Sequence, residues 1–181
     1  MRGIAFGIAG IVAIAAVSGI ALAAQNKDTV EVPGGLALYE CSGYEEWAAV
    51  SVSRPEDPEK LNLIVANPEM IAAYLAGVPG NGEPFPDGSK TMKMLWLPRA
   101  NEVAPFAVQE PGTLTGIGCM VKDSERFADT GGWGYMQFDY DPASDIFKPN
   151  TDPQGNDAKC GASCHQAAEA TDFVFTSYAK R

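Results

Sequence analysis

From about residue 47 onward, apolar and polar side chains alternate in several short stretches, which is the pattern of β-strands that bury one face. Residues 47–53 and 60–66 alternate with period two. Residues 89–97, 113–121 and 132–140 are expected to form three more strands, of which the last is rich in aromatic side chains. Segments rich in Pro, Gly or polar residues separate these stretches and predict loops.

A short helix is expected after the second strand. Asn67, Pro68 and Glu69 form a helix start, because they supply a side-chain cap, a proline in the first turn and an acid near the positive end of the helix dipole. The helix is expected to run to about Ala76 and to end at Gly77.

A second short helix is expected from a cap at Asp123 or Ser124 to Phe127, and residues 141–157 are expected to form a long polar loop. We find no internal repeat and no domain linker in the sequence. Several strands interrupted by short helices predict an α+β domain built on an antiparallel β-sheet.

The N-terminal segment has the outline of a secretory signal. Arg2 precedes an apolar run over residues 3–22, and Ala21-Leu22-Ala23 provides the small residues that export cleavage requires. We therefore expect a signal peptide at residues 1–24 and a mature domain at residues 25–181. An uncleaved membrane anchor is the alternative, since the run is about as long as a short bilayer span. Both interpretations place the domain outside the cytoplasm, and we expect a periplasmic protein.

The formal net charge of −10 restricts the kinds of partner that the chain is expected to bind. No block of Lys or Arg occurs in the chain, so nucleic acid and anionic lipid are unsuitable partners. A basic redox partner protein would suit the acidic surface.

The chain has four cysteines and one histidine, and the histidine, His165, directly follows Cys164. Covalent attachment of haem c needs two thiols for the vinyl groups and an imidazole for the iron, usually with two residues between the cysteines. Here three residues separate Cys160 from Cys164. Positions i and i+4 of a helix still share one face. The motif predicts a C-terminal haem-attachment helix in which Cys160 and Cys164 form thioethers and His165 binds the haem iron.

Other interpretations of these residues stay open. Cys160 is also free to form a disulfide with Cys164 or with Cys41, which would leave His165 an ordinary surface residue. A zinc site would need a further ligand from Cys41 or Cys119. Our expectation for Cys41 and Cys119 is a disulfide with each other, a pairing that spacing does not dictate.

Several apolar side chains have two interpretations. A methionine would supply a sixth iron ligand in an electron carrier. Methionines at strand positions more often pack in a core. We favour the core interpretation for Met92, Met94, Met120 and Met136. Aromatic side chains suit the wall of a haem pocket and also build ordinary cores; those in question are Trp133, Tyr135, Phe173 and Phe175.

Several motifs occur in an order that resembles the cytochrome P-460 family and its relatives, the cytochromes c′-β. They extend from about Tyr44 to Tyr178 and are Tyr44-Glu45-Glu46-Trp47, Phe85-Pro86-Asp87-Gly88, Val121-Lys122-Asp123-Ser124-Glu125-Arg126-Phe127-Ala128, Gly132-Trp133-Gly134 and, after the Cys-His pair, Thr171-Asp172-Phe173-Val174-Phe175-Thr176. The resemblance implies a sheet-rich fold, a homodimer, and a five-coordinate haem whose open side reacts with small nitrogenous molecules.

Two positions distinguish the branches that the resemblance implies. Members similar to cytochrome P-460 oxidise hydroxylamine and carry a lysine bonded to the porphyrin edge, whereas members similar to cytochrome c′-β bind nitric oxide or other gases. Lys93 falls at the position of the cross-linking lysine, and an exposed, solvated lysine is its alternative interpretation. Gly118 falls where hydroxylamine-oxidising members place a carboxylate, so the usual general base is missing unless Glu102 or Glu110 replaces it.

The expected function is an exported mono-haem c-type cytochrome that binds nitric oxide or a similar small nitrogenous ligand at an open iron site. One alternative is an oxidoreductase of hydroxylamine and nitric oxide, or a peroxidase, on the same scaffold. The other is a haem-free exported domain stabilised by disulfides.

Overall fold

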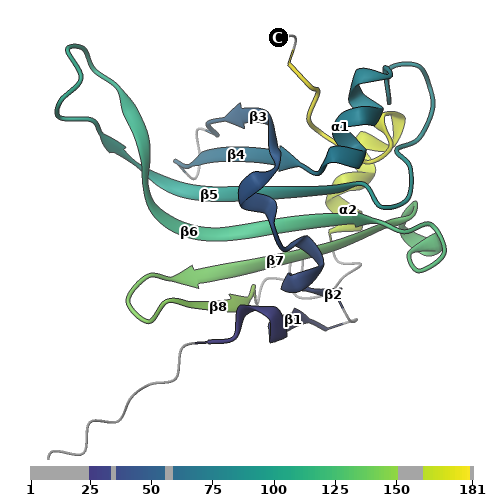
Figure 1. The fold of residues 1–181 in the computed structure, drawn as a ribbon, viewed down its shortest axis with the longest axis horizontal. Coiled ribbons are helices and arrows are strands. Elements are labelled where there is room, and N and C mark those ends of the chain that lie inside the picture. The colour runs from purple at the N-terminus through teal and green to yellow at the C-terminus, as the bar shows by residue number, and fades with distance from the viewer. Residues whose placement is uncertain (1–24, 34–35, 56–58, 151–160, 180–181) are drawn as a thin grey trace, which may run out of the picture.

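The computed structural model describes residues 25–33, 36–55, 59–150 and 161–179 (Figure 1). The predicted signal peptide at residues 1–24 and the predicted thioether residue Cys160 lie outside these ranges. No helix in the described ranges is long and apolar enough to cross a membrane.

The described ranges form one six-stranded antiparallel sheet in the order β3-β4-β5-β6-β7-β8, so each strand pairs with its neighbour along the chain. The strands are β3 (Ala48–Ser53), β4 (Leu61–Ala66), β5 (Lys90–Ala100), β6 (Gln109–Lys122), β7 (Trp133–Asp141) and β8 (Ile146–Pro149). A separate two-stranded ribbon consists of β1 (Glu31–Val32) and β2 (Leu36–Ala37). The predicted α+β fold with an antiparallel sheet is confirmed.

Helix α1 (Pro68–Leu75) follows β4 where the sequence predicts it. The side chain of Asn67 accepts hydrogen bonds from the backbone N–H groups of Met70, at 3.2 Å, and Lys90, at 2.9 Å, so one residue caps the helix and ties it to β5. Gly77 ends the helix with a φ of 98°, a left-handed conformation that glycine adopts without strain.

The C-terminal helix α2 (Ala162–His165) is short and continues as a 3-10 helix at Gln166–Thr171. Other 3-10 turns in the described ranges are Lys27–Thr29, Leu38–Cys41, Tyr44–Glu46 and Ala128–Thr130.

Three expectations from the sequence need correction. The segment from Asp123 to Phe127 is a single hydrogen-bonded turn rather than a helix, and Phe127 N–H donates to the carbonyl of Asp123 at 3.0 Å without a continuing ladder. The expected loop at residues 141–157 contains β8, which pairs with β7. Strands β5 and β6 extend beyond their predicted ends, because a long hairpin continues the ladder between them to Ala100 and Gln109.

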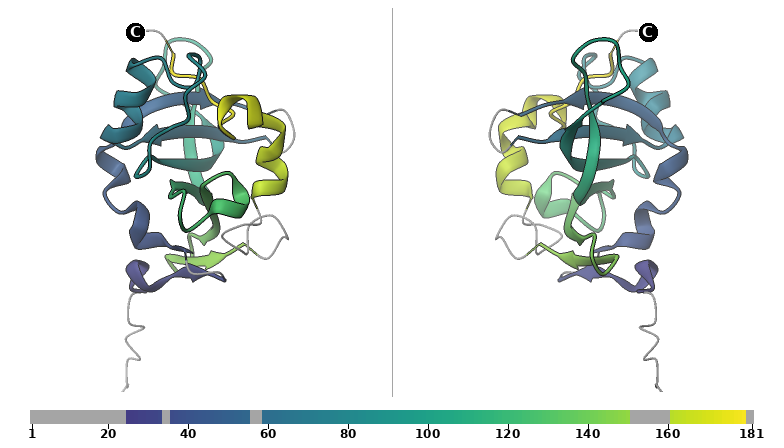
Figure 2. Two further views of the ribbon diagram at one scale, coloured as in Figure 1. Left: turned by 90° about the vertical axis from the view of Figure 1, so that its right-hand side faces the viewer. Right: turned by 90° about the vertical axis from the view of Figure 1, so that its left-hand side faces the viewer.

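The two faces of the sheet support two separate hydrophobic cores, because side chains alternate between faces along each strand. The first core combines N-terminal residues such as Val32 and Leu36 with one face of the central strands, including Met92, Ile117 and Met136. The second core packs Met70 and Tyr74 of α1 and Val174 of the C-terminal segment against the other face. Figure 2 shows the N-terminal and C-terminal segments on opposite sides of the strands.

Candidate functional site

Two rows of residues that cross the sheet form the floor of a cavity on the second-core side. The register places Ile64, Lys93, Gly118 and Gln137 in line across β4, β5, β6 and β7. The next row on the same face runs through Thr91, Met120 and Tyr135. The C-terminal segment closes the opposite side with Gly161, Cys164, His165, Val174, Phe175 and Thr176. The cavity has a volume of about 380 Å³, within the usual range of ligand sites.

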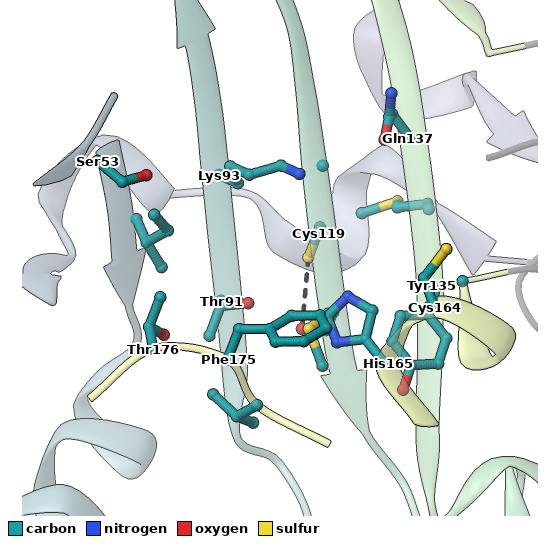
Figure 3. Close-up of a pocket in the computed structure, with 16 residues that line it drawn as sticks. Ser53, Thr91, Lys93, Cys119, Tyr135, Gln137, Cys164, His165, Phe175 and Thr176 are labelled. Atoms are coloured by element: carbon teal, nitrogen blue, oxygen red, sulfur yellow. Dashed lines mark hydrogen bonds between the residues drawn. The ribbon is translucent and has the colours of Figure 1, made fainter. Parts of the chain in front are cut away.

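His165 lies at the end of α2 and projects into this cavity (Figure 3). Its Nδ1 atom is 2.7 Å from the backbone carbonyl oxygen of Phe173, so Nδ1 carries the proton and donates, and the lone pair of Nε2 is left to bind a metal. The ring lies between the rings of Tyr135 and Phe175, with centroid distances of 4.8 Å to each.

Burial lowers the pKa of His165 below its ordinary value. The hydrogen bond to Phe173 acts in the opposite direction, and the positive charge of Lys93 lowers the pKa further. The site therefore favours the neutral imidazole, which is the form that binds iron.

Lys93 reaches into the cavity from the middle of β5, as alternation along this strand predicts. Burial lowers its pKa, while negative charge on Cys164 would raise it. A methyl group built on Gly118 would lie 3.6 Å from Cε of Lys93, so the lysine side chain runs directly over the glycine. This packing contradicts the alternative in which Lys93 is an exposed, solvated lysine.

None of the described residues that line the cavity carries a carboxylate. Gly118 occupies the position where the resemblance implies one, and a Cβ atom there would make only ordinary contacts. Glu102 and Glu110 do not line the cavity, and Glu110 instead pairs with Arg99 at 2.8 Å and Asn101 at 2.6 Å near the hairpin tip. Neither glutamate therefore supplies the missing base.

Three of the four cysteines lie in the described ranges, and two of these three form a disulfide. Cys41 and Cys119 form the expected disulfide, which links the 3-10 turn Leu38–Cys41 to β6. This bond excludes both a Cys41–Cys160 disulfide and a zinc site with either cysteine as a thiolate ligand. Cys164 is a free, exposed thiol at the edge of the cavity. The part of the chain that the structure describes holds no cluster of three metal-ligating side chains.

The methionines follow the core interpretation. Met92 and Met136 are buried in the first core, and Met94 packs against it. Met136 also lines the cavity. Met120 packs against the second core and lines the cavity. Among the aromatic residues considered as a pocket wall, Tyr135 and Phe175 line the cavity, whereas Trp133 is fully buried.

The residues of the cavity fit a haem c group. His165 presents an unprotonated ring nitrogen, Cys164 presents a free thiol on the adjacent residue, and apolar surfaces surround both. Phe175 leaves 61% of its surface exposed beside the imidazole, which gives a flat apolar group a surface to cover. The buried hydroxyl of Tyr135 has no hydrogen-bond partner within the described ranges, so the site has a spare polar group.

Sequence analysis missed several residues that contribute to the site, and Gln137 and the carbonyl of Phe173 are two instructive cases. Gln137 shares a sheet face with Tyr135, so alternation along β7 was a sufficient signal to find it. The carbonyl of Phe173, which orients His165, left no signal, because every residue carries a carbonyl and only the fold decides where it points.

A family model described as Cytochrome P460 matches residues 41–176, well over half of the chain. The matched range contains Lys93, Gly118, Cys160, Cys164 and His165. No curated protein matches the chain.

Proposed function

The chain belongs to the cytochrome P460 family, as its motifs predict, and from this premise we propose that it binds nitric oxide or a similar small nitrogenous ligand at an open haem iron site. Membership of this family makes the chain a haem c cytochrome. The identity of the ligand, the absence of turnover and the site residues are parts of the proposal.

In the proposed site, His165 holds the iron through Nε2, and Cys164 and Cys160 hold the porphyrin through thioethers. The haem, when bound, supplies the iron coordination position at which a small ligand binds. The chain contains one histidine, so no second imidazole is available to occupy that position. Phe175 and Tyr135 keep the imidazole between two aromatic rings and thereby limit its rotation.

The observation that carries the proposal is the set of side chains in the cavity. Oxidation of hydroxylamine requires a base that accepts protons from the substrate, and no carboxylate lines the cavity within the described ranges. Binding of nitric oxide requires no proton transfer. A cavity with an imidazole, a glycine at position 118 and mainly apolar walls therefore suits reversible binding better than turnover.

A second candidate, hydroxylamine oxidation or peroxidase activity on the same scaffold, is favoured by Lys93. Its amine lies in the cavity, and burial favours the neutral form that forms covalent bonds. A lysine cross-link to the porphyrin edge is part of this candidate.

Export to the periplasm is also proposed, since the Cys41–Cys119 disulfide is of the kind that persists in oxidising compartments.

The resemblance further supports a homodimer, and the charge of −10 supports a basic redox partner protein. Sedimentation of the mature protein tests the dimer.

The test uses protein exported together with a c-type maturation system. Ferric and reduced protein is titrated with nitric oxide, and steady-state oxidation of hydroxylamine is measured with an electron acceptor. We expect saturable binding of nitric oxide and no turnover above that of free haem. An ordinary high-spin ferrous spectrum is expected, whereas a strongly red-shifted, broad Soret band would indicate the lysine cross-link.

Gly118→Glu provides the sharper comparison, because the cavity has room for a Cβ at this position. We expect this variant to gain hydroxylamine oxidation, and Thr113→Glu, an exposed position of the same strand outside the cavity, to gain none. Turnover by the wild-type protein would contradict the binding proposal and favour the enzyme. Absence of haem absorbance would contradict the haem site itself.

A further inference from the structure

A buried ion pair lies behind the candidate iron ligand. Lys122 and Asp172 expose 6% and 11% of their side chains, and no other ion pair in the described ranges is buried on both sides to this degree. The Lys122 ammonium donates to both Asp172 carboxylate oxygens, at 2.8 and 3.0 Å, and to the carbonyl of Gly131 at 2.9 Å. Its three N–H donors are therefore all used, and it also lies 5.1 Å from the centre of the Trp133 ring.

Asp172 connects three parts of the fold. Besides pairing with Lys122 at the end of β6, its carboxylate accepts a hydrogen bond from the backbone N–H of Phe85 at 2.9 Å. Phe85 belongs to the loop between α1 and β5, and Asp172 to the segment that follows the 3-10 helix Gln166–Thr171. The ion pair thus fastens the C-terminal segment to both the sheet and this loop.

The fastened segment has an unusual backbone. Asp172 and Phe173 have φ values of 51° and 63°, in the left-handed region that residues other than glycine seldom adopt. Such conformations persist where surrounding contacts hold them. Asp172 is held by the ion pair, and the Phe173 ring packs so closely on Gly131 that a Cβ there would overlap with it.

This backbone turn directs the carbonyl of Phe173 at His165. The carbonyl oxygen lies 2.7 Å from Nδ1, and the Phe173 N–H is itself bonded to the carbonyl of Ala168 at 2.8 Å. A carbonyl on Nδ1 selects the tautomer with a free Nε2 and fixes the rotation of the ring.

We propose that the Lys122–Asp172 ion pair is a positioning device for His165, which it orients toward the haem iron by holding residues 172 and 173 in the turn that presents the Phe173 carbonyl. The inference rests on the proposed function in so far as His165 is the iron ligand. Lys122 and Asp172 touch neither haem nor ligand in this scheme, and they act through the imidazole.

Asp172→Asn is the informative variant. The amide keeps the size of the side chain, still accepts from Phe85 N–H and tolerates a left-handed backbone, but it removes the charge that pairs with Lys122. The matched control is Glu40→Gln, which makes the same change in the more exposed Arg126–Glu40 pair and keeps the hydrogen bond from Ala37 N–H.

Two measurements report directly on the bond that the His165 imidazole makes to iron and on its tautomer. In the ferrous haem protein, resonance Raman spectroscopy gives the iron–histidine stretching frequency. In the haem-free full-length chain, ¹⁵N spectra of labelled histidine give the tautomer, and the single histidine makes the assignment unique. We expect Asp172→Asn to shift or broaden the iron–histidine band and to convert a pure Nδ1–H tautomer into a mixture, and Glu40→Gln to change neither.

An unchanged band and tautomer in folded Asp172→Asn would overturn the inference, and so would an equal shift in Glu40→Gln. If Asp172→Asn does not fold, Lys122→Met combined with Asp172→Asn removes both charges and leaves no buried ion unpaired, and the same loss of the single tautomer is expected. If the wild-type protein takes up no haem, the proposed function fails, while the tautomer measurement still decides whether the ion pair positions His165.

Discussion

Lys93 shows how one residue acquires its chemistry from its neighbours. Its side chain runs over Gly118 and enters a cavity that contains no carboxylate within the described ranges. Burial therefore lowers its pKa without an acid to oppose the effect, apart from negative charge at Cys164. The amine is consequently a better nucleophile near neutral pH than a lysine on the surface.

The lowered pKa of Lys93 predicts a pH dependence of stability. Between the lowered value in the folded protein and the ordinary value of 10.5, the unfolded chain binds more protons than the folded chain, so the free energy of unfolding contributed by Lys93 rises with pH. We expect Lys93→Met to stabilise the haem-free protein near pH 7, and the gain to shrink as the pH approaches about 10. Urea unfolding at several pH values measures this, with Lys148→Met at an exposed lysine as the control. A gain independent of pH would contradict the prediction.

At the scale of elements, the site depends on the register of β4, β5, β6 and β7. Antiparallel pairing brings Lys93, Gly118 and Gln137 into one row, and a slip of one residue would move these side chains to the first core. The Cys41–Cys119 disulfide lies on that opposite face and ties the N-terminal segment to β6 directly behind the cavity.

Removal of this disulfide is predicted to destabilise the fold. The bond closes a loop across a sequence separation of 78 residues, and disulfides of this kind contribute roughly 2–4 kcal/mol. We expect Cys41→Ala with Cys119→Ala to lose about that much free energy of unfolding, as measured by urea titration of the haem-free protein. Cys164→Ala, at a free and exposed thiol, should change it by less than about 0.5 kcal/mol. Equal effects of the two replacements would contradict the structural role.

For the whole molecule, residues of the sheet and of the C-terminal segment line the cavity together. The C-terminal segment packs on the sheet from one side (Figure 2). Both hydrophobic cores consist of the chain's own side chains, and neither includes Cys164 or His165. The fold should therefore form before haem is attached.

This independence predicts the outcome of removing the proposed attachment residues, Cys160 and Cys164. We expect Cys160→Ala with Cys164→Ala to lack covalent haem while it keeps the far-ultraviolet circular dichroism of the sheet and a cooperative unfolding transition. Mass spectrometry detects the missing haem, and thermal unfolding detects the fold. Loss of cooperative unfolding would show instead that haem is part of the core.

The local sequence pattern alone predicted much of the architecture, because strands and helix caps depend on residues that lie close together along the chain. Local pattern located five strands, two of them by period-two alternation, and pleating predicted the face on which Lys93 lies. The cap at Asn67 located α1. Strand β8 was missed, since Ile146–Pro149 is short and follows turn residues, and the expected helix at Asp123 was wrong because its cap supports only one turn.

The sequence by itself determined the family and the sheet, and it singled out Cys164, His165 and Lys93 as candidate site residues, because residue types and their spacing carry that information. Only the tertiary structure decided that Lys93 lies over Gly118, that Cys41 pairs with Cys119, and that a left-handed turn held by Lys122 and Asp172 aims a backbone carbonyl at His165. These contacts join residues distant in sequence, and a backbone carbonyl is the same in every residue. Their positions are therefore set by packing, burial and register rather than by any local pattern.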